Sequence, residues 1–302
     1  MNIRTCWYWI GFNITCWFPL PVAYLIADIL GVAHYFFARE WRRNYTANLR
    51  VLFPEKDTRA INRIVFRAFR NLARNLADQF RIHRNDRHSM ADRIETSAKD
   101  IEAFRIHRGK PLIVATGHFG HWELSASLPT SILGELNSIA LSEVDLTMDG
   151  FYLRARQAIG NNTVLLANAS RACMRLLKEG RPLAILTDRS YTEEGIVLDF
   201  FGRKALFPTG IAQLAMKYKA AILPYFIART HGKHFKAYVF DLISIPTKGA
   251  KAVRVETILK QYVAILEDVI LRHPENWHAF HPVWMEEVTG AKKGDIPAKL
   301  GE

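Results

Sequence analysis

The sequence predicts an α/β protein: a layered domain around a largely parallel sheet, preceded by an apolar N-terminal segment. From residue 93 onward, short apolar runs alternate with longer amphipathic runs, which is typical of a parallel sheet. The 302 residues can bury a sizeable core, and no long linker, internal repeat or low-complexity tract divides them. We therefore expect an apolar anchor at 1–38 and a single domain at 39–302. Within that domain we expect a basic helical region at 39–92 and an α/β core at 93–285.

The N-terminal segment carries no charged residue from 5 to 27, and its first acidic residue is Asp28. It includes aromatic residues of the kind favoured at membrane interfaces: Trp7, Tyr8, Trp9 and Trp17. Its length permits a transmembrane helix of about 20 residues. Pro19 and Pro21 interrupt the run, so two shorter helices or a re-entrant hairpin are equally compatible, and a buried core helix is the alternative. We expect a membrane anchor rather than a cleaved signal peptide, because no small-x-small cleavage site stands out.

The next segment is strongly basic. Arg63, Arg67, Arg70 and Arg74 recur at spacings of four, three and four, which places them on one helix face. The opposite face is apolar and comprises Ile61, Val65, Ala68, Leu72, Leu76 and Phe80. The segment is predicted to be an amphipathic helix that packs on the body and exposes an arginine stripe. A solvated charged face is the plain alternative to a docking surface.

The formal charge of +12 and the pI of about 9.7 call for an acidic partner: nucleic acid, an anionic membrane or an acidic protein. Nucleic acid is disfavoured because no recognisable nucleic-acid-binding motif accompanies the charge. We expect the arginine stripe to face an anionic membrane surface or an acidic carrier protein. Cys6, Cys16 and Cys173 form no metal or redox motif, which favours a reducing compartment.

The elements of the α/β core are predicted from apolar runs and from the proline and glycine residues that bound them. The expected strands are Leu112–Ala115, Ser138–Ser142, Thr163–Leu166, Leu183–Thr187, Val197–Phe200, Ile222–Ile227 and Ala237–Phe240. The expected helices are Ala98–Arg108, Trp122–Leu133, Asp149–Ile159, Ser170–Glu179, Thr209–Tyr218 and Val253–Arg272. Pro208 at a helix start and Gly180 after a helix end support these boundaries.

The hexapeptide from His118 to Glu123 lies between an expected strand and an expected helix, where α/β enzymes place their chemistry. Imidazole with a carboxylate partner takes a proton from an alcohol near neutral pH. No serine or cysteine nucleophile is suitably placed, so a His118–Glu123 dyad would activate a hydroxyl of the substrate. Acyl transfer to an alcohol needs that arrangement. The alternatives are a hydrogen-bonded structural histidine and a zinc site of His118, His121 and Glu123.

Other chemistry-bearing residues follow along the chain. Arg154 and Arg156 lie in an expected helix and could bind a phosphate or a thioester oxyanion, with solvent exposure as the alternative. Asp188 follows an expected strand, the same kind of position as His118. The run from 200 to 210 enters a helix whose N-terminus could accept an anionic group. The segment from 274 to 281 carries two more histidines, which we expect to be structural.

The ordered set of these motifs resembles the bacterial lipid A biosynthesis acyltransferases and their lysophospholipid-acyltransferase-like relatives. The stretch from His118 to Glu123 is similar to that family's His-x4-Glu/Asp signature. Further similar stretches are Asn48–Glu55, Asp188 with Phe200-Phe201-Gly202, Pro208-Thr209-Gly210 and Pro274-Glu275. The resemblance covers about 20 to 285. The chain departs from the family at His281-Pro282-Val283-Trp284, where members often have His-Arg-Arg-Phe, and its loop at 191–194 is more acidic than usual. These departures leave the acceptor open between a lipid A precursor and another lipid.

The resemblance implies a glycerol-phosphate-acyltransferase-like fold on the cytoplasmic face of the inner membrane. It implies transfer of a fatty acyl chain from acyl carrier protein or acyl-coenzyme A to a hydroxyl of a lipid A precursor, a related glycolipid or a lysolipid. No metal or cofactor is implied. His118 would be the general base and Glu123 its orienting carboxylate, while Arg154 or Arg156 and Asp188 would line the site. Backbone N–H groups near Gly120, or a nearby arginine, would stabilise the oxyanion. Alternatives are a zinc-dependent amidase or esterase and a non-catalytic basic membrane adaptor.

Overall fold

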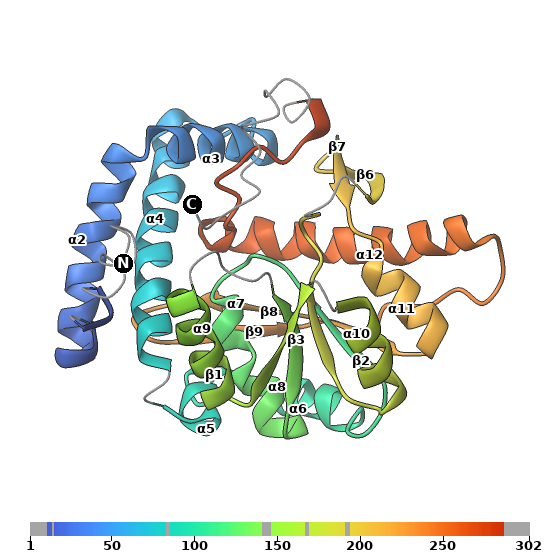
Figure 1. Ribbon diagram of the computed structural model, residues 1–302. Helices are drawn as coiled ribbons and strands as arrows, with labels where there is room; N and C mark the ends of the chain where they lie inside the picture. Colours follow the sequence, from blue (N-terminus) through green and yellow to red (C-terminus); the bar gives the residue numbers. More distant parts are fainter. Residues whose placement is uncertain are drawn as a thin grey trace.

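A seven-stranded sheet forms the centre of the computed structural model, which describes residues 11–13, 15–82, 85–140, 146–166, 169–190 and 194–286, without the side chains of 146–149. Its strands are β1 (Ile94–Glu95), β2 (Leu112–Thr116), β3 (Leu136–Ala140), β4 (Asn161–Leu165), β5 (Leu183–Leu186), β8 (Ala221–Arg229) and β9 (Phe235–Val239). The order is β1-β9-β8-β2-β5-β3-β4 (Figure 1). Strands β8, β2, β5, β3 and β4 run parallel, whereas β9 is antiparallel to β8. The prediction of a largely parallel sheet is confirmed.

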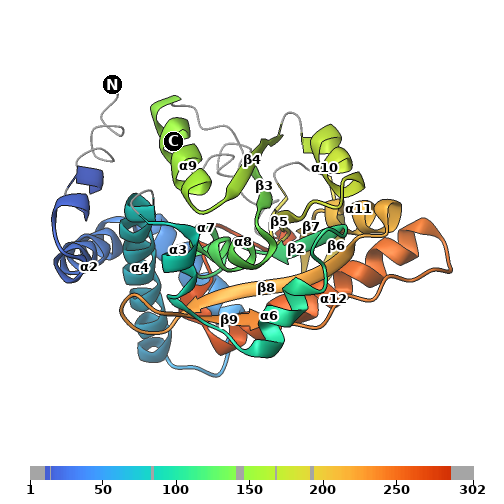
Figure 2. The ribbon, with the colours of Figure 1, turned by 90° about the horizontal axis from the view of Figure 1, so that it is seen from below.

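Helices cover both faces of the sheet. They are α2 (Leu20–Phe37), α3 (Arg39–Leu52), α4 (Thr58–Arg81), α5 (Arg87–Ala91), α6 (Ala98–Arg105), α7 (Trp122–Ser125), α8 (Ser127–Leu133), α9 (Leu146–Ala158), α10 (Ala169–Lys178), α11 (Gly210–Tyr218) and α12 (Lys251–Arg272), followed by the 3-10 turn η3 (Pro274–Asn276). Viewed from below, α2 and α4 lie at one end of the molecule and α10, α11 and α12 at the other (Figure 2).

The alternation of side chains along each strand separates two cores. In β2, Ile113 and Ala115 join the cluster that α4, α10, α11 and α12 bury, whereas Leu112 and Val114 join the cluster under α6, α8 and α9. All five residues of β2 are buried. A strand covered on both faces is continuously apolar, which explains why Leu112–Ala115 was recognisable as a strand without any polar alternation.

Two expected elements differ from the structure. The expected helix Trp122–Leu133 is broken at Ala126 into α7 and α8. Pro129 has no N–H to donate to the Ser125 carbonyl one turn earlier, and the Tyr225 hydroxyl donates to that oxygen instead, at 3.1 Å. This replacement lets the chain bend without leaving a buried carbonyl unpaired.

The expected strand Val197–Phe200 does not enter the main sheet. It belongs to β6 (Ile196–Phe200), which pairs in antiparallel fashion with β7 (Arg203–Phe207) in a separate hairpin. The two turn residues, Phe201 and Gly202, both have positive φ angles, of 51° and 74°. Such a two-residue turn matches the twist of a tight hairpin. The run from 200 to 210 therefore passes through β7 before it reaches α11, the helix that it was expected to enter.

The apolar helix α2 packs along α4 in the orientation that Figure 1 shows at the flank of the molecule. Its inward side is small or polar: Tyr24, Ala27 and Gly31 are buried. A Cβ at Gly31 would lie 3.1 Å from the Phe69 carbonyl oxygen, so the helices approach closely. Within the described residues, α2 is the one helix long and apolar enough to span a membrane, and it has 22% of its residues buried.

Half of the expected arginine stripe is not a free surface, which corrects the prediction. Arg70 and Arg74 of α4 bind Asp28 of α2, and the Arg74 Nε–Asp28 Oδ1 distance is 2.7 Å. Arg63 and Arg67 are exposed, as expected. Two of the four arginines therefore fasten the apolar helix to the body, because a carboxylate on an apolar helix needs a cation nearby.

Replacement of Asp28 by Ala is predicted to destabilise the fold. Arg70 and Arg74 would lose their partner on α2, and charge-assisted hydrogen bonds of this kind contribute about 2 kcal/mol. Urea unfolding in detergent should show a lower free energy of unfolding for Asp28→Ala. Arg67→Ala on the exposed face of α4 is the matched control and should unfold like the wild type. Equal stability of all three proteins would contradict the fastening role of Asp28.

Candidate active site

His118 and Asp188 meet at the carboxyl edge of the sheet. Strands β2 and β5 are parallel neighbours, and Thr116 is in register with Leu186. His118 follows Thr116 by two residues and Asp188 follows Leu186 by two residues. Because neighbouring parallel strands end at the same edge, equal offsets bring the two side chains together.

His118 contacts the Asp188 carboxylate twice, through its ring and through its backbone N–H. The His118 ring nitrogen Nδ1 is 2.9 Å from Asp188 Oδ1, and the His118 backbone N–H donates to Oδ2 at 2.8 Å. A Cβ at Gly117 would lie 2.9 Å from the Asp188 carboxyl carbon, so only glycine leaves room for this approach. Burial raises the pKa of Asp188, but the charge and hydrogen bonds of His118, with the charge of Arg189, hold that pKa below its ordinary value. The Asp188 carboxylate is therefore ionised at neutral pH. Nδ1 of His118 carries a proton and donates the hydrogen bond to this carboxylate.

The partner that the structure gives Glu123 is Arg156, whereas the predicted dyad pairs Glu123 with His118. Its two carboxylate oxygens bind Arg156 of α9, at 2.8 Å from Nε and 2.6 Å from Nη2. Glu123 lies in the first turn of α7, beyond the bend at Gly120, so its side chain faces α9 instead of the end of β5. The carboxylate that orients the His118 ring is thus Asp188, and Glu123 forms a separate, half-buried ion pair.

The remaining predicted site residues fall in different places. Arg156 binds the Glu123 carboxylate, whereas Arg154 is exposed on α9. Gly120 has a φ of +58°, and a Cβ there would lie 1.7 Å from the Ile227 carbonyl oxygen. No other residue fits that position, because β8 runs directly against the loop backbone.

The alternative zinc site is not assembled. Nδ1 of His121 accepts a hydrogen bond from the Leu124 backbone N–H, while His118 and Glu123 are bound to Asp188 and Arg156. Across the part of the chain that the structure describes, no three His, Cys, Asp or Glu side chains are arranged to hold a metal ion. No observation therefore favours a zinc-dependent hydrolase.

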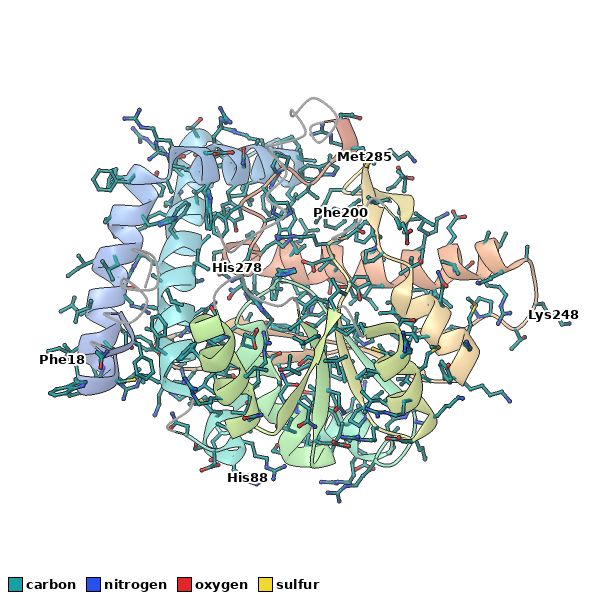
Figure 3. The ribbon with its side chains drawn as sticks, in the orientation of Figure 1. Phe18, His88, Phe200, Lys248, His278 and Met285 are labelled. Carbon is teal, nitrogen blue, oxygen red and sulfur yellow. The ribbon has the colours of Figure 1, made fainter. Side chains whose placement is uncertain are left out.

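The segment after η3 pairs with the loop that carries His118. The Gly120 N–H donates to the Asn276 carbonyl at 2.7 Å, and the His278 N–H donates to the His118 carbonyl at 2.9 Å. Nε2 of His278 donates to the Gly120 carbonyl at 2.9 Å. Figure 3 labels His278, which lies between α4 and the carboxyl edge of the sheet. The expectation that this histidine is structural agrees with these contacts.

A buried charge cluster lies behind the loop. Asp78 of α4 is fully buried and accepts hydrogen bonds from Arg93 at 2.7 Å and Arg229 at 2.6 Å. The hydroxyl of Tyr24 on α2 donates to the same carboxylate at 2.7 Å. Burial raises the pKa of Asp78, but the two arginine charges hold that pKa below its ordinary value. Asn75 links the cluster to the loop, because its Nδ2 donates to the Gly120 carbonyl at 2.8 Å.

A cavity of about 40 Å³ lies beside the His118–Asp188 pair. Trp122 lines it and packs edge-on against the His118 ring, with the ring centroids 5.3 Å apart. Most of the other lining residues are apolar or small: Val114, Ser125, Ala126, Pro129, Leu136, Ile139, Ala184, Leu186 and Tyr225. The Glu123–Arg156 pair forms part of the same wall.

Buried histidines predict a loss of stability in mild acid. Burial is the main cause that lowers the pKa of His121 to about 3, of His278 to about 4 and of His281 to about 3. A histidine in the unfolded chain has a pKa of about 6.5, so between about pH 6.5 and 4 the unfolded chain binds more protons. The free energy of unfolding should therefore fall as the pH falls through this window, by at most about 1.4 kcal/mol per pH unit for each histidine.

Urea titrations at several pH values test this prediction. His278→Gln removes one buried histidine and should give a shallower dependence on pH than the wild type. His88→Gln changes an exposed histidine and should leave the slope unchanged. A wild-type stability that is constant between pH 7 and 5 would contradict neutral burial of these rings.

Comparison with known proteins identifies the family of this chain. The profile of the family described as bacterial lipid A biosynthesis acyltransferase matches residues 2–286. The phosphatidylinositol mannoside acyltransferase of Mycobacterium tuberculosis (strain ATCC 25618 / H37Rv) is 22% identical over 199 residues, which are 63% of this chain but only 60% of that relative. The phosphatidylinositol mannoside acyltransferase of Mycolicibacterium smegmatis is 21% identical over 233 residues, 76% of this chain and 73% of the relative. With the family profile spanning nearly the whole sequence, this chain belongs to the bacterial lipid A biosynthesis acyltransferase family.

Proposed function

We propose that this protein transfers a fatty acyl group from an acyl thioester to a hydroxyl group of a membrane lipid. The observation that carries the proposal is the His118–Asp188 pair at the carboxyl edge of the sheet. The proposal is supported by the family to which the chain belongs and by the apolar cavity beside the pair.

In the proposed reaction, His118 acts as general base. Asp188 accepts a hydrogen bond from Nδ1–H, so Nε2 is the nitrogen that takes the proton from the acceptor hydroxyl. The hydroxyl oxygen attacks the thioester carbonyl and forms the new C–O bond. The tetrahedral intermediate collapses with cleavage of the C–S bond. The leaving thiolate then takes from Nε2 the proton that the acceptor hydroxyl had given up.

Arg189 is the arginine best placed to stabilise the developing oxyanion. It follows Asp188 in the chain, and its charge helps to lower the pKa of that carboxyl. Its Nη2 is 3.0 Å from Nδ1 of His281, and its buried Nε has no hydrogen-bond partner among the described residues. Arg156, by contrast, is engaged by Glu123. We assign Glu123 and Arg156 to binding at the cavity wall, not to proton transfer.

The acceptor class is proposed from the relatives. Phosphatidylinositol mannoside is named as the substrate of the two mycobacterial enzymes. A hydroxyl of a glycolipid of that general kind, or of a lipid A precursor, fits the proposed chemistry equally. The donor is a thioester of acyl carrier protein or coenzyme A, and the exposed Arg63 and Arg67 offer a basic surface to either acidic donor.

We further propose that α2 lies along the membrane surface, on the cytoplasmic side of the inner membrane. Its inward face is fastened to α4, while its outward face exposes Val22, Leu25, Ile29, Leu30, Phe36 and Phe37. Trp17 and Phe18 extend this face, and Figure 3 shows Phe18 at the outer flank of α2. A helix held on one side and apolar on the other suits an interfacial position, with the basic start of α3 next to it.

Substitutions at the pair test the reaction. His118→Ala should abolish transfer, and Asp188→Asn should lower kcat by about 10²–10⁴-fold, because the ring loses its oriented tautomer. Glu123→Gln should raise KM more than it lowers kcat, since Glu123 binds Arg156 at the cavity wall. The assay follows acyl transfer from hexadecanoyl-coenzyme A, or the same acyl group on acyl carrier protein, to phosphatidylinositol mannoside or a lipid A precursor. Normal turnover by a folded His118→Ala protein would rule out the mechanism.

Flotation with vesicles tests the membrane face. The double variant Leu25→Glu with Ile29→Glu places two charges on the outward face of α2 and should reduce binding to vesicles of phosphatidylcholine and phosphatidylglycerol. Val253→Glu, at an exposed apolar position of α12 on the opposite flank, is the control and should bind like the wild type. Unchanged flotation of the α2 variant would place the membrane contact elsewhere.

A further inference from the structure

We infer that Asn75 and His278 are positioning residues for His118. Both donate hydrogen bonds to the carbonyl oxygen of Gly120, at 2.8 Å and 2.9 Å, and so fix the loop from which His118 projects. Neither side chain takes part in the proposed proton transfer. The inference rests on the proposed function, in which His118 is the general base.

The orientation of Asn75 is determined by a charge. Its Oδ1 accepts from Arg229 Nη2 at 2.6 Å and from Nε at 3.2 Å. A guanidinium group only donates, so the amide cannot flip, and Nδ2 must face the Gly120 carbonyl. Arg229 is itself held by Asp78, which receives a second arginine, Arg93. Asn75 thus connects a buried ion cluster to the catalytic loop.

His278 holds the same carbonyl from the C-terminal segment. Burial lowers its pKa to about 4, so the ring is neutral near pH 7, and the hydrogen bond to Gly120 requires the proton on Nε2. Nε2 of His278 is 3.4 Å from Asn75 Nδ2, and both nitrogens donate to the one oxygen. The backbone N–H of His278 also donates to the His118 carbonyl, so His278 binds the loop through two hydrogen bonds.

The loop cannot hold this shape by itself. Gly120 has a positive φ and no side chain, and its carbonyl is buried, so loss of both donors would leave an unpaired polar group that the peptide would rotate to satisfy. His118 lies only two residues away. A displacement of about 1 Å between a base and its hydroxyl lowers the rate by about 100-fold.

Asn75→Asp separates positioning from folding. Aspartate keeps the acceptor for Arg229 and adds a negative charge where two arginines face one carboxylate, so the cluster stays paired. It removes the donor to Gly120 and sets an anionic oxygen against the carbonyl. Asn71→Asp is the matched control: the same change one turn earlier on α4, where Asn71 donates to the Glu275 carbonyl at 3.2 Å.

We expect Asn75→Asp to lower kcat by about tenfold to a hundredfold with little change in KM or in melting temperature. Asn71→Asp should retain the wild-type kcat. In ¹⁵N-histidine NMR, the signal of the His118 Nδ1 proton should shift or broaden in Asn75→Asp and stay in place in Asn71→Asp. A wild-type kcat and an unchanged His118 signal in folded Asn75→Asp would overturn the inference.

A second pair of variants tests His278 without touching the ion cluster. The amide nitrogen of Gln reaches the position of the histidine Nε2, whereas that of Asn reaches only the position of Nδ1. His278→Gln should therefore keep kcat within about threefold of the wild type, and His278→Asn should lower it by about tenfold or more. Equal kcat values for the two variants would contradict the role of the Nε2 donor. If the wild type transfers no acyl group from either donor, the proposed function fails, and the NMR comparison still decides whether Asn75 positions His118.

Discussion

The rest of the structure depends on the buried carboxylate of Asp78. A charge with no solvent exposure is tolerable only when it is paired, and removal of a partner from such a pair costs about 3–5 kcal/mol. Asp78 satisfies this constraint with Arg93 before β1, Arg229 at the end of β8 and the Tyr24 hydroxyl on α2. One side chain therefore joins the apolar helix α2, the amphipathic helix α4 and the sheet. The loop that carries His118 is attached to the same cluster through Asn75.

The proposed chemistry follows from the way the strands end. Two parallel neighbours, β2 and β5, stop in register and place a histidine and an aspartate side by side. Glycines at 117 and 120 are required there, because the carboxylate and the β8 backbone approach the loop where any Cβ would clash. The second carboxylate, Glu123, turns toward Arg156 and the cavity. The signature therefore supplies the proposed base and a residue of the cavity wall, while the carboxylate that contacts His118 comes from the end of β5, 70 residues later in the chain.

The sequence pattern predicts much of this fold because strands buried on both faces leave continuous apolar runs, as in β2 and β8. It places His118 correctly at a strand end for the same reason. It does not reveal that β5 lies between β2 and β3, since strand order is set by tertiary packing, and so it favours the nearby Glu123 over the distant Asp188 as the partner. In the sequence, the only sign of the hairpin turn at Phe201-Gly202 is a glycine after an aromatic residue, which does not by itself predict a hairpin.

The buried cluster leaves a weaker trace in the sequence. Asp28 is the one acidic residue in α2, and Asp78 is the one acidic residue in the arginine-rich α4. Lone carboxylates in such surroundings indicate ion pairs, as both prove to be, but the partner cannot be assigned without the packing. Arg229 likewise ends an otherwise apolar strand. Asn75 carries no signal at all, because a single asparagine on a helix is ordinarily exposed.

The most direct measurement of the proposed catalytic role is a double-mutant cycle between His118 and Asp188. Rates of acyl transfer would be compared for the wild type, His118→Ala, Asp188→Ala and the double variant, each checked for folding by circular dichroism. If Asp188 acts only by orienting His118, its removal costs about 10²–10⁴-fold in the wild type and almost nothing once His118 is absent. Losses that multiply in the double variant would show that the two residues act independently and would contradict the pair as the proton-abstracting unit.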